Sequence, residues 1–138
     1  MYQKAKPERL ESPRKVLIIS SDNILGEVMS KILDRYFTCE VYEATCSAEA
    51  TSRLYSGGFD MYLVDLSTPG ISGPMLIRKI QHMNPSGPII VVAGSGSEDE
   101  IDDIRSLGIS NIIYKPIRIA AFLEMVAGML LENQRICI

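Results

Sequence analysis

The stretch FDMYLVDLSTPGISG, residues 59–73, places a carboxylate between a short apolar run and a turn. Residues 61–64 are uniformly apolar and soon followed by Thr-Pro-Gly, a pattern that predicts a strand buried on both faces. Asp65 then stands at the carboxyl end of this strand. Two interpretations are open from the residues alone. Asp65 is either a turn residue that accepts backbone hydrogen bonds from Ser67 or Thr68, or a reactive carboxylate at the mouth of a sheet.

The same unit of strand and helix recurs along the rest of the chain. Apolar runs or alternating patterns predict strands at 15–20, 38–44, 61–65, 88–93 and 111–114. Helical periodicity predicts helices at 24–36, 47–58, 73–84, 97–108 and 117–134, with Ser47 as the cap of the second. This alternation implies an α/β fold with a doubly wound, five-stranded parallel sheet. Helices are expected on both faces, because right-handed crossovers place them there.

Apolar residues at helical spacing predict which side of each helix faces the sheet. The expected inward residues are Leu25, Val28, Met29, Ile32, Leu33, Tyr36, Leu76, Ile80, Met83, Ile101, Ile104, Leu107, Ile119, Phe122, Leu123, Val126 and Leu130. The methionines at 75, 83, 125 and 129 fall mostly on core spacing, so packing explains them better than a binding surface does. In the last helix Ile117, Met125 and Leu131 form a second apolar strip. It is either a homodimer or partner surface, or part of a wide core face.

Length, charge and cysteine content limit the function classes. The 138 residues suit one domain, expected at 15–138 after a flexible polar tail at 1–14. The apolar runs fall short of the roughly 18 residues of a membrane span and no signal sequence is evident, so we expect a cytoplasmic protein without membrane contact. A net charge of −3 argues against direct nucleic-acid binding. The absence of a C-x-x-C motif predicts reduced thiols, at Cys39, Cys46 and Cys137.

Polar residues follow the expected strands at the edge where such sheets bind ligands. In doubly wound folds ligands gather outside the carboxyl ends of the strands, where the strand order reverses. The residues expected at that edge are 20–23, Asp65, 93–95, Lys115 and Pro116. A carboxylate and an ammonium group should therefore meet there. The pair is either a structural ion pair that caps the sheet or part of a functional site.

Over residues 15–134 the chain resembles the receiver domains of bacterial two-component response regulators. The resemblance rests on FDMYLVDLSTPGISG, on YKPI at residues 114–117 and on the order of five strand and helix pairs. It implies a flavodoxin-like (βα)5 fold. It also implies that Asp65 is the phosphoacceptor, that Lys115 senses the phosphoryl group and that the Ser67 carbonyl is a magnesium ligand. Pro116 would follow a cis peptide bond.

The chain departs from the family pattern at four positions. The acidic pair that holds magnesium in the family falls on Ser20 and Ser21, the switch hydroxyl falls on Ala93, and the aromatic of the fifth strand falls on Ile112. Magnesium prefers charged oxygen ligands, so we expect it to bind weakly or not at all. Because phosphoryl transfer depends on neutralising charge, phosphorylation should then be slow.

Nearby residues offer partial replacements. Asp22 either restores some negative charge to the metal site, as a ligand beside Asp65 and Ser67, or caps the first helix. Ser95 replaces the lost hydroxyl only if its glycine-flanked turn bends inward. Tyr114 lies one strand period from Ile112 and is expected to stand in for the missing aromatic.

Three function hypotheses follow. The first is a receiver that accepts phosphate on Asp65 from a histidine kinase or phosphotransfer protein, signals to a downstream protein and catalyses at most its own phosphorylation and dephosphorylation. The second is a pseudo-receiver that binds a partner without phosphorylation. The third is a small flavodoxin-like enzyme or cofactor binder. The missing G-x-G-x-x-G fingerprint and the absence of a catalytic His or Cys arrangement argue against the third.

Overall fold

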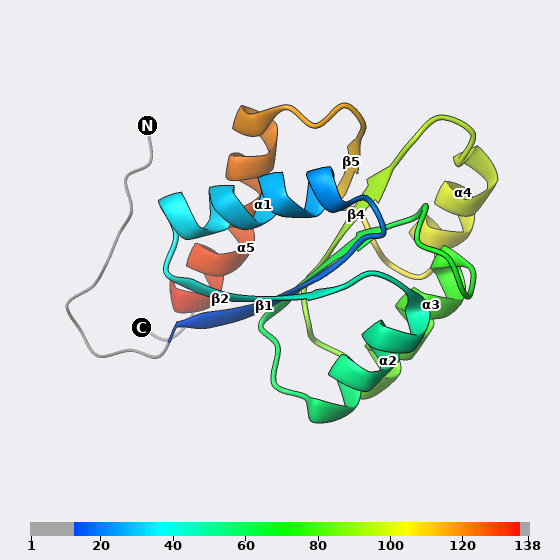
Figure 1. Ribbon diagram of the computed structural model, residues 1–138, viewed down its shortest axis with the longest axis horizontal. Coiled ribbons are helices and arrows are strands. Elements are labelled where there is room, and N and C mark those ends of the chain that lie inside the picture. Colours follow the sequence, from blue (N-terminus) through cyan, green and yellow to red (C-terminus); the bar gives the residue numbers. More distant parts are fainter. Residues whose placement is uncertain (1–12, 136–138) are drawn as a thin grey trace.

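The computed structural model describes the backbone of residues 13–135 and the side chains of residues 13–130 (Figure 1). Its elements alternate strictly between strand and helix, as expected. They are β1 (Arg14–Ile19), α1 (Asn23–Tyr36), β2 (Cys39–Ala44), α2 (Ser47–Ser56), β3 (Met61–Asp65), α3 (Gly73–Met83), β4 (Ile89–Ala93), α4 (Glu98–Ser106), β5 (Ile112–Tyr114) and α5 (Ile119–Arg135). The strands form one parallel sheet in the order β2-β1-β3-β4-β5. The predicted five-stranded α/β fold is confirmed.

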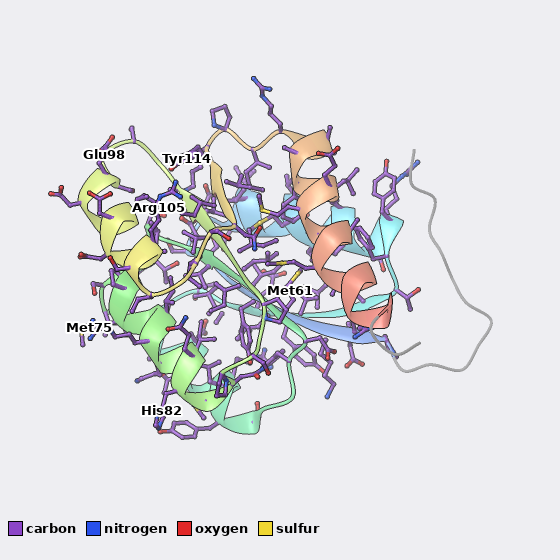
Figure 2. The ribbon with its side chains drawn as sticks, turned by 180° about the vertical axis from the view of Figure 1, so that it is seen from behind. Met61, Met75, His82, Glu98, Arg105 and Tyr114 are labelled. Carbon is purple, nitrogen blue, oxygen red and sulfur yellow. The ribbon has the colours of Figure 1, made fainter. Side chains whose placement is uncertain are left out.

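Helices cover both faces of the sheet, and alternate strand residues point into two separate cores. On one face Leu17, Tyr62 and Val64 pack with α2, α3 and α4. On the other face Val16, Met61 and Leu63 pack with α1 and α5, and Figure 2 shows Met61 beside α5. Because β1, β3 and β4 are buried on both sides, their sequences are apolar runs rather than alternating patterns.

The order of the strands places a crevice at the carboxyl end of the sheet. The chain moves from β1 outward to β2, then returns past β1 to β3 and continues to β4 and β5. The direction therefore reverses between β1 and β3, whose last paired residues are Ile19 and Val64. Such a reversal leaves the loops after the two strands on opposite sides of a gap, where ligands bind in this class of fold. Ser20 and Asp65 stand at that gap.

Most expected element boundaries differ from the observed ones by one or two residues. Arg14 belongs to β1, because it pairs with Cys39 and its backbone N–H donates to the Thr38 carbonyl. The strand expected at 15–20 therefore begins one residue earlier, and residues 1–12 of the expected tail lie outside the described part. Ser47 is the first residue of α2 rather than its cap, because Cys46 is the N-cap and its carbonyl accepts from the Ala50 N–H. The Ser47 N–H donates to the Pro69 carbonyl.

Several residues expected to face the core are exposed. Val28 is 40% exposed, Met83 37% and Ile119 54%. Met75, on core spacing by position, is 60% exposed. Conversely, Ile117, Met125 and Met129 pack against the core beneath α1 and α5, which favours a wide core face over a free apolar strip. The side chain of Leu131 lies outside the described residues. Among the helices of residues 13–135, none has the length and apolar character to span a membrane.

Candidate functional site

Asp65 is the last residue of β3 and is held between two neighbouring strands. It pairs with Val92 in β4, and the following residue, Leu66, donates its N–H to the Val92 carbonyl. The chain then turns, with the Thr68 N–H donating to the Asp65 carbonyl and the Thr68 hydroxyl reaching the Ile19 carbonyl of β1 at 3.4 Å. These contacts leave Asp65 only 1% exposed. A buried carboxylate requires compensating hydrogen bonds or a cation.

Both oxygens of the Asp65 carboxylate accept hydrogen bonds. Oδ1 accepts from the Ser67 N–H at 3.1 Å and from the Ser67 hydroxyl at 2.9 Å. Oδ2 accepts from the Ser20 hydroxyl at 2.8 Å. The Lys115 ammonium lies 3.2 Å from each oxygen. The Ser67 N–H donates to Asp65 as the turn interpretation predicts, and the carboxylate and the ammonium meet as expected. This contact is common to a structural ion pair and to a functional site.

These partners determine the charge state of Asp65. Burial raises its pKa, whereas hydrogen bonds from the Ser67 backbone, the Ser20 and Ser67 hydroxyls and the Lys115 ammonium lower it, and the net pKa lies below the usual value of 3.8. At neutral pH the carboxylate is therefore ionised. An ionised, buried carboxylate next to an ammonium group is common in functional sites. Structural ion pairs have the same arrangement.

The loop after β1 supplies hydroxyl groups and a helix cap. Ser20 is 5% exposed, and its hydroxyl oxygen also accepts from the Asp22 N–H at 3.1 Å. The Asp22 carboxylate caps α1, since its Oδ1 accepts from the N–H groups of Ile24 and Leu25, each at 3.1 Å. Ser21 is exposed. The structure thus favours the capping role of Asp22 over a role as metal ligand beside Asp65.

The residues around Asp65 do not fit a magnesium ion. Within the described residues, no three His, Cys, Asp or Glu side chains lie together as a metal-binding group. The groups that reach Asp65 are two hydroxyls, one backbone N–H and the Lys115 ammonium. Magnesium requires several hard oxygen ligands, preferably charged, and here Lys115 already supplies the positive charge. The Lys115 ammonium therefore balances the charge of Asp65, and the hydroxyls of Ser20 and Ser67 add hydrogen bonds.

Lys115 reaches Asp65 from the end of β5. Its N–H donates to the Ala93 carbonyl at 2.8 Å, which continues the pairing of β4 with β5, and the peptide bond between Lys115 and Pro116 is cis. The side chain is 28% exposed, and its ammonium also lies 3.5 Å from the Ser67 hydroxyl. The two residues expected to meet at the sheet edge do so.

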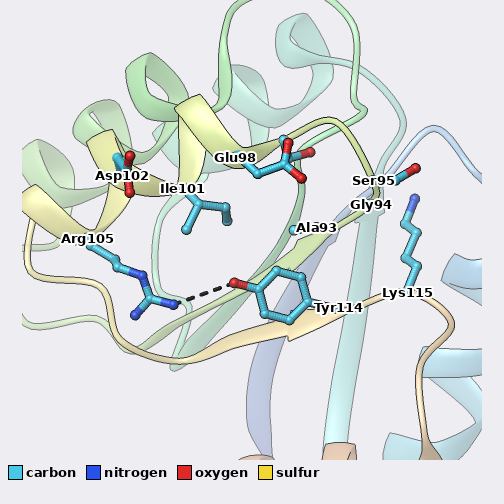
Figure 3. A pocket seen from close by; sticks show the side chains of 10 residues that line it. Ala93, Gly94, Ser95, Glu98, Ile101, Asp102, Arg105, Tyr114 and Lys115 are labelled. Atoms are coloured by element: carbon cyan, nitrogen blue, oxygen red, sulfur yellow. Dashed lines mark hydrogen bonds between the residues drawn. The ribbon is translucent and has the colours of Figure 1, made fainter.

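A pocket of about 440 Å³ lies beside Lys115, between β5 and α4. Figure 3 shows Ala93 on its floor and Lys115 extending toward the loop of Gly94 and Ser95. Ala93 is fully buried, and it places a methyl group where the resemblance implies a switch hydroxyl. Ser95 is exposed on the rim. Within the described residues, Ser95 makes no hydrogen bond to Asp65 or Lys115.

Tyr114 occupies the open side of this pocket. It pairs with Ala93 and shares a strand face with the half-buried Ile112, as the strand period requires. Its ring is 53% exposed, and its hydroxyl accepts from the Arg105 guanidinium at 3.5 Å (Figure 3). Sequence reasoning missed Arg105. Its spacing of four residues from the inward Ile101 was the signal, because residues i and i+4 lie on the same side of a helix.

Comparisons with known proteins agree on one family. The family model for the response regulator receiver domain matches residues 16–127. The chain is 24% identical over 108 residues to the chemotaxis protein CheY of Pseudomonas aeruginosa, covering 74% of this chain and 84% of that protein. It is 27% identical over 101 residues to the transcription factor SKN7 of Candida albicans, of which it spans only 18%, while 73% of this chain is covered.

Solved structures show the same fold. A CheY-like response regulator receiver domain from Methanospirillum hungatei superposes with a TM-score of 0.82 at 24% identity, covering 90% of this chain and 98% of that one. The chemotaxis response regulator CheY4 of Vibrio cholerae superposes with a TM-score of 0.76 at 19% identity, covering 86% and 99%. The chain spans about a fifth of the fungal transcription factors that it resembles, and most of the chemotaxis proteins.

Proposed function

The chain belongs to the response regulator receiver domain family of two-component systems, and we propose that it signals by accepting a phosphoryl group on Asp65. Receiver domains of this family interact with kinases or phosphotransfer proteins and with downstream effectors. The proposed donor is accordingly a histidine kinase or a phosphotransfer protein in the cytoplasm, and the proposed output is a contact with another protein. The observation that supports this role is the Lys115 ammonium 3.2 Å from both oxygens of Asp65 at the carboxyl edge of the sheet.

The proposed reaction transfers a phosphoryl group from a phosphorylated imidazole. An Asp65 oxygen attacks phosphorus, the P–N bond breaks, and its electron pair leaves with the imidazole, which takes up a proton. The product is an acyl phosphate. Oδ1 is the proposed nucleophile, because its partner Ser67 is exposed, whereas Oδ2 faces the buried Ser20. Beyond this reaction on its own side chain, no enzymatic activity is proposed.

Charge neutralisation during transfer would fall on the protein's own groups. Receiver domains typically bind magnesium, but the donor set around Asp65 does not fit this ion. The Lys115 ammonium and the hydroxyls of Ser20 and Ser67 are the donors close enough to reach the oxygens of an incoming phosphoryl group. The Lys115 ammonium carries one positive charge, whereas a magnesium ion carries two and would neutralise more of the charge on the transferring phosphoryl oxygens. We therefore expect transfer to be slow and insensitive to magnesium.

A second candidate function is protein binding without phosphorylation. It is favoured by one observation, that Asp65 is 1% exposed and both of its oxygens already accept hydrogen bonds. Transfer requires at least one of these bonds to be exchanged. In this alternative the contact between Asp65 and Lys115 is a permanent ion pair that stabilises the carboxyl edge of the sheet. A homodimer through the last helices is compatible with either function, and the exposed Ile119 is the residue that would contribute to it.

Incubation with phosphoramidate, a small mimic of phosphohistidine, separates the two functions. The first predicts an intact-mass gain of one phosphoryl group that hydroxylamine removes, since hydroxylamine cleaves acyl phosphates. Asp65→Asn is the matched control and should gain nothing. Modification of Asp65→Asn to the same extent, or no modification of the unaltered chain after prolonged incubation, would leave only the phosphorylation-independent function.

A further inference from the structure

A second surface feature lies on α2 and α3, and none of its residues contacts Asp65. It is a groove of about 630 Å³, lined by Tyr55, Met75, Arg78, Lys79, His82 and Met83. We call it the α2–α3 groove. Figure 2 shows Met75 and His82 pointing away from the sheet on the outer side of α3. Its residues are distinct from the pocket beside Tyr114 and from the strip on α5.

Three large apolar side chains are exposed in the α2–α3 groove. Tyr55 is 74% exposed, Met75 60% and Met83 37%. Single exposed apolar residues are ordinary on a protein surface, but these three line one groove. Methionine adapts its shape to different partners, and tyrosine offers both an apolar ring and a hydroxyl group. Burying them against a partner would remove this apolar surface from water.

The same groove is positively charged in a chain of net charge −3. Its cations are Arg78 and Lys79, and α3 contains no Asp or Glu. The one acidic residue of α2, Glu49, accepts from both the N–H and the hydroxyl of Thr45. Within the described residues Arg78 and His82 have neither an ion pair nor a hydrogen-bonded side-chain partner. Lys79 donates a hydrogen bond to the Thr51 hydroxyl at 3.4 Å, its one partner in the part of the chain that the structure describes.

We propose that the α2–α3 groove binds an acidic amphipathic helix of a partner protein. Apolar residues on one face of that helix would cover Tyr55, Met75 and Met83, and carboxylates beside them would pair with Arg78 and Lys79. Helices docked in grooves use apolar residues at i, i+3, i+4 and i+7. The surrounding positive charge selects acidic partners and speeds their association.

Two occupants from this chain fit less well. The amino-terminal residues 1–12 carry the cations Lys4, Lys6 and Arg9 against the carboxylates Glu8 and Glu11, so they lack the net negative charge that the groove favours. The acidic helix α4 of a second copy has the right charge, but its apolar residues Ile101 and Ile104 are buried in its own core. It therefore has nothing with which to fill the groove. A separate protein that offers both features is the better match.

Selection from a phage-displayed library of 16-residue peptides tests the proposal. Enriched peptides should combine acidic residues with apolar residues at helical spacing. Arg78→Glu should lower the affinity for the best synthetic peptide by about tenfold or more, because an attractive charge becomes a repulsive one. Met75→Ser should also weaken it. Lys31→Glu, which reverses a cation on α1 that is 77% exposed, is the matched control and should change affinity by less than about twofold.

Other outcomes would overturn the proposal. Enrichment of basic peptides, equal binding to Arg78→Glu, or no enrichment against the unaltered chain each contradicts an acidic amphipathic partner. Tighter binding to a DNA duplex than to the best peptide would make the groove a nucleic-acid site instead. Asp65→Asn should bind the selected peptide normally, so failure of the phosphorylation proposal is distinguishable from failure of this one.

Discussion

Removing the Lys115 ammonium should destabilise the fold in a way that depends on the charge of Asp65. In Lys115→Met the carboxylate keeps its hydrogen bonds from Ser20 and Ser67 but loses the cation 3.2 Å from both oxygens. At an effective dielectric constant of about 20, the gross attraction at this distance is about 5 kcal/mol. Lys115 gives up much of its hydration to make the contact, so the net loss should be about 1–3 kcal/mol.

The pH dependence distinguishes this loss from simple loss of packing. The pKa of Asp65 lies below its usual value of 3.8 in the folded chain, so the stabilisation is present above that value and is lost as pH falls through the folded pKa. In Lys115→Met this pKa should rise, because one of the groups that lower it is gone. The gap in unfolding free energy between the two chains should therefore be full at neutral pH and shrink on acidification toward and below pH 3.8.

Urea unfolding at a series of pH values measures this effect. Lys79→Met is a matched control, because Lys79 is also half-buried but its one hydrogen-bond partner among the described residues is the Thr51 hydroxyl. Lys79→Met should lower the free energy of unfolding by less than about 1 kcal/mol, and this loss should not vary with pH in the range where Asp65 titrates. Asp65→Asn combined with Lys115→Met should lose less than the sum of the single losses. A Lys115→Met loss that is absent, or that is equally large at acidic pH, would refute the electrostatic argument.

Three further changes test other parts of the account. The double variant Ser20→Asp with Ser21→Asp should bind magnesium in a calorimetric titration, and its melting temperature should fall in chelator and recover with magnesium. A melting temperature that does not respond to magnesium would show that the missing carboxylates are not what excludes the ion. Gly70→Ala should destabilise by about 1–3 kcal/mol in urea unfolding, because Gly70 has φ +121° and an added Cβ would collide with the Ser47 side chain; wild-type stability would contradict this. Burial raises the pKa of Cys39 to about 11, so iodoacetamide should label this thiol slowly in the folded chain and rapidly in urea. Peptide mapping measures the labelling, and fast labelling of Cys39 in the folded chain would contradict the prediction.

The fold was accessible from the sequence because its core strands are buried on both faces. Residues 61–64 and Ile89–Ala93 are short apolar runs bounded by polar or turn residues, and helical patterns separate them from their neighbours. Periodicity fixes the angle of a residue around a helix axis but not how far the sheet extends along that axis. For this reason Ile119 and Met83, in the first and last turns of their helices, were wrongly placed in the core.

The candidate site was accessible in part. Asp65 and Lys115 were located because the carboxyl ends of parallel strands gather at one edge. The hydrogen bond from Ser20 to Asp65 was not predicted, since it depends on a rotamer and on a loop that carry no periodic signal. The cap of α2 was wrongly assigned to Ser47, because Cys46 holds that position without a side-chain capping hydrogen bond, and capping preferences cannot reveal such a cap.

The rate of phosphorylation with and without magnesium tests the central claim most directly. Intact-mass spectrometry would follow the unaltered chain in phosphoramidate, with either excess chelator or millimolar magnesium, and Asp65→Asn would run in parallel. If the Lys115 ammonium and the hydrogen bonds from Ser20 and Ser67 take the place of magnesium, the phosphorylated form accumulates slowly, at the same rate in both conditions, and only when Asp65 is present. A gain that requires magnesium would contradict the metal-free site. No gain in either condition would contradict phosphoryl acceptance by Asp65 itself.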